Sequence, residues 1–69
     1  MPLSMAGIGE THTINRVRGR DEQRRFLESL GFVYGAEVTV VAQLAGNLIV
    51  DIKESRVAID RSTANRIMV

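Results

Sequence analysis

The sequence predicts a mainly β fold: a small barrel of about five strands with one α-helix across it and a short helical turn before the last strand. Short runs rich in β-branched residues recur along the 69 residues, and glycines separate them. Only one segment has the apolar spacing of a longer helix. Five short strands in so small a domain leave exposed edges, and closing the sheet removes those edges.

The first third of the chain is expected to hold one strand and the helix. Residues 11–17, THTINRV, are rich in β-branched side chains and stop before Gly19, which predicts a strand. Asp21 is the expected N-cap of a helix over EQRRFLESL. One face of that helix has i, i+3, i+4, i+7 spacing and is expected to pack on the core: Gln23, Phe26, Leu27 and Leu30.

Two glycines mark the joint between the helix and the next strand. Gly31 is the expected C′ residue, in the left-handed conformation that ends a helix, and Phe32 then folds back toward Leu27. The next four residues form a β-turn whose third position, Gly35, accepts a positive φ as type II requires. Five residues therefore have structural roles at this joint: Leu30, Gly31, Phe32, Gly35 and Val38, whose side chain enters the barrel.

A β-hairpin is expected after the joint. Residues 37–44 alternate as a strand does, and one row of side chains is expected on the same side: Val38, Val40, Ala42 and Leu44. Gly46-Asn47 is the expected two-residue turn, because glycine accepts the positive φ of a type II′ turn. Residues 48–53 form the return strand.

The remainder completes the barrel. Glu54-Ser55 is a weaker turn signal, and residues 56–59 form the next strand. Asp60 is the expected cap of a helical turn over residues 61–65, and residues 67–69 form the last strand. This order of elements over residues 1–69 is typical of a single SH3-like barrel domain.

Composition excludes several classes of protein. The formal net charge is +1, whereas strongly basic nucleic-acid binders carry a larger imbalance. There are no cysteines, which excludes a disulfide scaffold and thiolate metal sites. The N-terminal residues have no basic region followed by an apolar run, and no apolar stretch approaches the roughly 20 residues that cross a bilayer. We therefore expect a cytoplasmic protein.

The titratable residues do not form a catalytic pattern. His12 is the single histidine, its one neighbouring carboxylate is Glu10, and we interpret it as an exposed strand residue. The carboxylates are scattered beside basic residues, as on a solvated surface. We therefore expect no enzyme activity, no cofactor and no metal site.

Surface residues leave alternatives open. Five arginines fall within ten positions and fit a solvated surface, a protein docking patch or, least well, a nucleic-acid site: Arg16, Arg18, Arg20, Arg24 and Arg25. Nucleic-acid sites interleave aromatic residues, and Phe26 alone is nearby, so no nucleic-acid partner is expected. Met5 and Ile8 are expected to close the core. Val33 and Tyr34 either complete the core or dock a partner.

Residues 24–41, RRFLESLGFVYGAEVTVV, resemble the signature of the FeoA family, the small cytosolic component of bacterial ferrous iron uptake. The matching positions are Arg24, Leu27, Leu30, Gly31, Phe32, Gly35, Val38 and Val40. The family's N-terminal entry segment and its usual ending also have counterparts, so the resemblance covers essentially the whole chain. Tyr34 stands where the family often has proline.

The resemblance implies an SH3-like barrel and a partner, the membrane iron transporter whose cytosolic end carries a GTPase domain. The protein would then be an accessory or regulatory factor, peripheral to the membrane through that partner and capable of weak homo-oligomer formation. The expected partner contacts are Arg24, Leu27, Val33, Tyr34 and Leu44. Insertion of Arg24 or Arg25 into the GTPase site is a further hypothesis. A related barrel forms the C-terminal domain of iron-dependent transcriptional repressors. The alternative function is therefore that of a regulatory module of such a transcriptional regulator.

Overall fold

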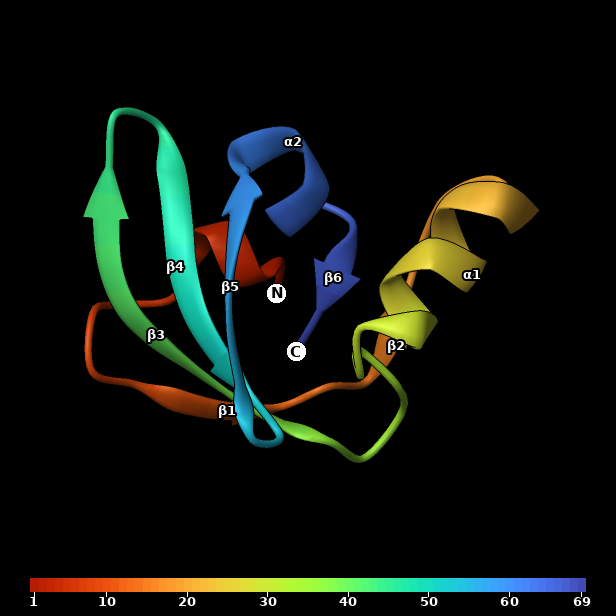
Figure 1. Cartoon of the computed structure of the whole chain (residues 1–69), viewed down its shortest axis with the longest axis horizontal. Helices are drawn as coiled ribbons and strands as arrows, with labels where there is room; N and C mark the ends of the chain where they lie inside the picture. The colour runs from red at the N-terminus through yellow and green to blue at the C-terminus, as the bar shows by residue number, and fades with distance from the viewer.

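The computed structural model describes residues 1–69 and confirms the mainly β prediction. Two sheets, one with strand order β1-β3-β4-β5 and one with β2-β6, curve around a common core (Figure 1). The strands are β1 (Thr11–Thr13), β2 (Arg16–Val17), β3 (Glu37–Leu44), β4 (Asn47–Ile52), β5 (Ser55–Asp60) and β6 (Ile67–Met68). The helices are the 3₁₀ turn η1 (Leu3–Met5), α1 (Asp21–Ser29) and α2 (Arg61–Ala64).

The single strand expected over residues 11–17 is two strands. β1 pairs antiparallel with β3, whereas β2 pairs antiparallel with β6. The break falls at Ile14, whose side chain is fully buried and whose N–H donates to the Ala36 carbonyl at 2.8 Å. The Asn15 N–H then donates to the Met68 carbonyl at 2.7 Å. The chain therefore changes sheets at this point, which period-2 alternation alone does not reveal.

The N-terminal segment closes the second sheet. Pro2 bridges Met68, and the Val69 N–H donates to the Met1 carbonyl at 2.8 Å. η1 was not predicted, and its burial pattern corrects the expectation for this segment. Leu3 is fully buried, whereas Met5 is 71 % exposed and points away from the core. Ile8, at the following turn, is 62 % exposed, so the expected core-closing role of both residues is wrong.

The joint after α1 has the expected geometry. Gly31 has a φ of +106°, and its N–H donates to the Glu28 carbonyl at 3.0 Å. The Phe32 N–H donates to the Leu27 carbonyl at 3.0 Å, so the two bonds form a Schellman motif. Both Phe32 and Leu27 belong to the buried core. The Ala36 N–H donates to the Val33 carbonyl at 3.0 Å with Gly35 at a φ of +84°, which confirms the predicted β-turn.

The start of α1 and the face that it buries differ from expectation. Arg20, not Asp21, is the N-cap, and its N–H donates to Gln23 Oε1 at 3.3 Å. Leu27 is the one buried residue of the helix. Phe26 is 63 % exposed, so its expected place in the core is wrong. Figure 1 shows why: α1 stands at the side of the barrel, and a short helix in that position buries only a narrow strip.

A β-bulge divides β3 into two halves. The register with β4 shifts between Val40 and Ala42. Val40 pairs with the buried Val50, whereas Ala42 pairs with Ile49 on the opposite face of β4. Ala42 and Leu44 therefore lie outside, and Leu44 is 64 % exposed. The expected single inward row is correct only as far as Val40, because a bulge inverts the alternation.

Both hairpin turns lie one residue earlier than predicted. Leu44 pairs with Asn47, so Ala45-Gly46 forms the first turn, and both residues have positive φ, 49° and 83°. This is the pattern of a type I′ turn, not the predicted II′. Ile52 pairs with Ser55, and Lys53 takes a φ of 55° in the second turn. Asn47 and Ser55 are therefore strand residues.

Replacing Gly31 with alanine tests the helix–strand joint. A Cβ there would lie 3.3 Å from Ile52 Cγ1 and would be held at positive φ. We expect Gly31→Ala to lower the free energy of unfolding by about 1–2 kcal/mol in urea titrations. Gly7→Ala is the control, because Gly7 has no positive φ and its Cβ meets only the flexible Glu10 side chain. Equal stabilities of the two variants would contradict the proposed role of Gly31.

Candidate functional site

The expected partner contacts do not form one patch. Tyr34 lies at the turn before β3 and is 83 % exposed, while Leu44 lies at the other end of the same strand. Eight strand residues span about 23 Å at 3.3 Å per step. Figure 1 shows the two turns at opposite corners of the molecule. One flat contact through both residues would need an interface as long as the barrel.

The other three expected contacts have different surroundings. Leu27 is only 2 % exposed, so it is a core residue and its expected role as a partner contact is corrected. Val33 is half-buried beside Tyr34. Arg24 is exposed, but its guanidinium forms a salt bridge with the Asp21 carboxylate one helical turn away. Arg24 and Tyr34 are therefore the exposed residues among the expected contacts on α1 and the turn after it, and the half-buried Val33 forms the tip of that turn together with Tyr34.

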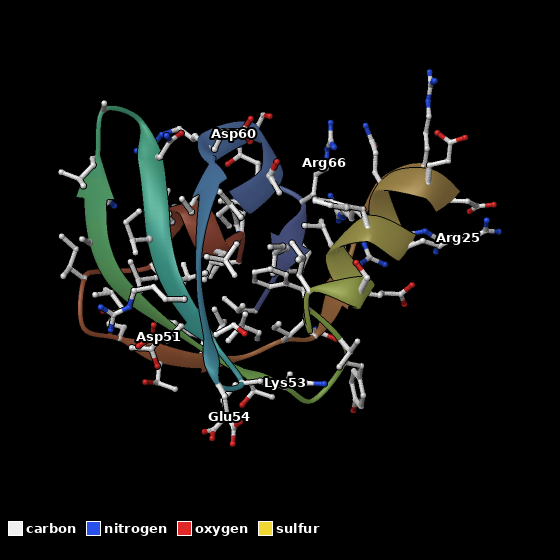
Figure 2. All side chains as sticks on the ribbon, viewed as in Figure 1. Arg25, Asp51, Lys53, Glu54, Asp60 and Arg66 are labelled. Atoms are coloured by element: carbon white, nitrogen blue, oxygen red, sulfur yellow. The ribbon has the colours of Figure 1, made fainter.

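A groove between α1 and α2 is the most apolar hollow on the surface. Its volume is about 250 Å³, and Phe26 and Leu27 form its apolar part. The polar lining residues are Glu22, Gln23, Thr63 and Arg66. In Figure 2 Arg66 lies between α2 and α1. The sequence did not predict this groove, because Phe26 was assigned to the core and α2 had no predicted position relative to α1.

Local hydrogen bonds hold the α2 wall of the groove. Asp60 is the predicted N-cap, and its Oδ1 accepts the Thr63 N–H at 2.8 Å and the Ser62 hydroxyl at 3.2 Å. These hydrogen bonds, chiefly from Thr63, with the nearby Arg66 charge, hold the pKa of the Asp60 carboxyl below its ordinary value. The Arg18 N–H donates to the Arg66 carbonyl at 2.7 Å, which links the segment before α1 to the end of α2.

Charge is unevenly divided over the molecule. Residues 16–30 and 60–66 hold seven arginines and four carboxylates, a net charge of +3. The other residues hold two cations and four carboxylates, a net charge of −2. Among the seven arginines only Arg24 forms a salt bridge. The groove therefore lies in the positive part of the protein, although the whole chain is close to neutral.

The remaining titratable pairs lie on the sheet. Arg56 Nε donates to Asp51 Oδ1 at 2.7 Å, and this bond lowers the pKa of the Asp51 carboxyl. His12 Nε2 lies 2.9 Å from Glu10 Oε1, and the contact lowers the pKa of the Glu10 carboxyl. No group of three metal-ligating side chains occurs in the structure.

A family model described as the FeoA domain matches residues 1–69. The chain belongs to the FeoA family. This family is associated with ferrous iron transport, and its members are small accessory or regulatory domains that are not known as enzymes. No curated protein matches the chain. None of its helices is long and apolar enough to span a bilayer.

Solved structures show the same SH3-like fold. An iron uptake regulatory protein (FeoA) is 28 % identical with a TM-score of 0.89, and the match covers 97 % of this chain and 91 % of that one. FeoA of Stenotrophomonas maltophilia, solved in complex with zinc, is 31 % identical with a TM-score of 0.87, over 99 % and 87 %. For that SH3 domain protein, a role as a ferrous iron transport activating factor has been suggested.

A manganese-dependent transcriptional repressor has the same fold. Its TM-score is 0.87 at 24 % identity, and the match covers 97 % of this FeoA chain but 39 % of the repressor. The barrel is therefore one part of a longer protein there. At this level of identity the likeness concerns the fold.

Asp60→Ala tests the cap that positions α2. We expect a lower urea midpoint at pH 7, because the variant leaves the Thr63 N–H without its acceptor. The folded-state pKa of Asp60 lies below its ordinary 3.8, so its stabilising effect is present above about pH 4 and is lost as the pH falls through the lower value. The midpoints of wild type and variant should therefore converge below about pH 4.

Asp60→Asn is the matched control for this experiment. Asparagine also caps helices well, so this variant should keep most of the stability at pH 7 while losing the contribution of the charge. A difference between wild type and Asp60→Ala that is the same at pH 7 and pH 2 would show that the carboxylate charge has no part in the cap.

Proposed function

We propose that this FeoA protein is a cytoplasmic accessory or regulatory factor of ferrous iron uptake that binds the cytosolic GTPase domain of the membrane iron transporter. The observation that carries the proposal is the FeoA domain match over the whole of residues 1–69. The suggested activating role of the Stenotrophomonas maltophilia relative supports it.

The docking surface we propose is the tip formed by Val33 and Tyr34, together with Arg24 on α1. Tyr34 is the most exposed large apolar side chain of the protein. The type II turn and the Schellman motif fix its backbone on both sides, so little conformational entropy is lost when a partner covers it. Tyrosine is also among the residues that most often dominate interface energetics.

A second candidate function is a regulatory module of a metal-dependent transcriptional regulator. The similarity to the barrel of the manganese-dependent repressor supports it. Copurification with a DNA-binding protein, and a change in that protein's operator binding when the FeoA chain is added, would favour this candidate over the transporter.

Titration calorimetry with the purified GTPase domain tests docking. We expect a heat of binding in at least one nucleotide state, and Tyr34→Ser should weaken the affinity about tenfold, the loss typical of a central aromatic contact. Met5→Ser is the control, because Met5 is also an exposed apolar residue and lies outside the proposed surface. Absence of heat in every nucleotide state would rule out direct docking on that domain.

The arginine-insertion hypothesis makes a separate prediction. Arg24 pairs with Asp21 and belongs to the docking surface proposed above, not to the GTPase site, so we expect Arg24→Ala to change the GTP hydrolysis rate of the saturated partner domain less than about twofold. Arg25→Ala, which removes an arginine without a salt bridge, is the matched variant. A loss of the order of 10³-fold in either variant, as for an arginine finger, would instead assign that residue a catalytic role.

A further inference from the structure

The groove between α1 and α2 has the size of a single side chain's binding site. Its volume of about 250 Å³ lies below the range of about 300–1,000 Å³ that is usual for small-molecule sites. Phe26 forms its apolar part together with Leu27, and the Phe26 side chain is 63 % exposed. A large side chain this exposed, beside a hollow, is typical of a contact surface.

Charge limits what can enter the groove. Arg66 lines it, Arg61 belongs to the α2 wall, and Arg20 is the N-cap of the α1 wall. None of these three arginines forms a salt bridge. Glu22 is the one carboxylate in the lining. Glu22 and Arg66 offset each other in the lining, but the surrounding segments, residues 16–30 and 60–66, carry a net charge of +3, so a negatively charged partner is attracted and a basic one is repelled.

We propose that this groove binds an acidic peptide segment through one large apolar side chain, with its flanking carboxylates beside Arg66, Arg61 and Arg20. The anchor side chain would lie against Phe26 and Leu27, between the two helices. This surface is distinct from the Tyr34 tip, and the proposal does not depend on which protein carries the segment.

Two other occupants fit less well. A second copy of the chain would have to bring its own negative part to the groove. The exposed apolar residues of that part include Leu44 and Ile8, and at most one carboxylate lies within two residues of either. A drug-sized ligand exceeds the volume. A short peptide needs only a single anchor and two charged flanks.

A synthetic peptide tests the proposal without the transporter. The probe is acetylated and amidated Glu-Asp-Glu-Phe-Leu-Asp-Glu-Asp, titrated into the ¹⁵N-labelled full chain at low salt. We expect amide shifts concentrated at Gln23, Phe26, Thr63 and Arg66. Replacing the peptide's Phe and Leu with Ser should weaken binding about tenfold or more, because the anchor loses its apolar area. Raising the salt to 0.3 M should also weaken it.

Two variants of opposite sign separate this site from a non-specific charge effect. Arg66→Gln should weaken binding about two- to fivefold, and Glu22→Gln should tighten it by a similar factor, because both line the groove. Phe26→Ala should weaken binding further. Because the Phe26 side chain is 63 % exposed, this variant should still fold. Tyr34→Ser and Arg56→Gln, which change exposed residues elsewhere, should leave the affinity unchanged.

Several outcomes would overturn the proposal. One is the absence of amide shifts at millimolar peptide, and another is a set of shifts centred on the β4–β5 turn. Equal binding of a lysine-rich version of the peptide would also contradict it. Shifts of groove amides that depend on protein dilution would show that a second copy occupies the site. A negative peptide titration alongside heat from the GTPase domain would refute the groove and leave the proposed function standing. The reverse result would refute the function and keep the groove.

Discussion

Ile14 makes the pair of backbone hydrogen bonds on which the rest of the fold depends. Its N–H donates to the Ala36 carbonyl, and its carbonyl accepts the Gly35 N–H, both at 2.8 Å. The pair ties the point where the chain leaves the large sheet to the turn that follows α1. Ile14 is fully buried, so its own N–H and carbonyl are shielded from water. The angle between the sheets and the position of α1 are therefore fixed together.

The barrel strands and α1 differ in how much apolar surface they bury in the core. Strands β3 and β4 supply five of the thirteen core residues, whereas α1 buries only Leu27 and is held by its C-terminal Schellman motif. α2 is a single turn held by the Asp60 cap and by the fully buried Ala64. Elements with few buried contacts open at the lowest free-energy cost. By this criterion the α1 wall of the groove is expected to open more easily than the α2 wall or the barrel.

The sequence was sufficient where a local rule determined the structure. Gly31 and Gly35 require positive φ, Asp60 has the spacing of a cap, and each took its predicted conformation. Two local predictions, the Asp21 cap and the type II′ turn at Gly46-Asn47, were wrong. The other failures came where tertiary contacts decided. The break at Ile14 depends on a partner strand 50 residues away, and the bulge after Val40 leaves no signal in an alternating apolar run. Phe26 has helical spacing suitable for the core, but its burial depended on how far α1 extends beyond the barrel, which its own sequence does not encode.

The two ends of the chain pair with each other in the small sheet, as Pro2 bridges Met68 and the Met1 ammonium donates to the Val69 carbonyl at 2.8 Å. Figure 1 shows N and C side by side. Domains whose ends meet tolerate insertion and circular permutation, because a host chain can leave and return at the same place without spanning the fold. The barrel can in this sense be joined to other chains as one unit. A similar barrel is one part of a repressor chain more than twice as long, which is compatible with this property.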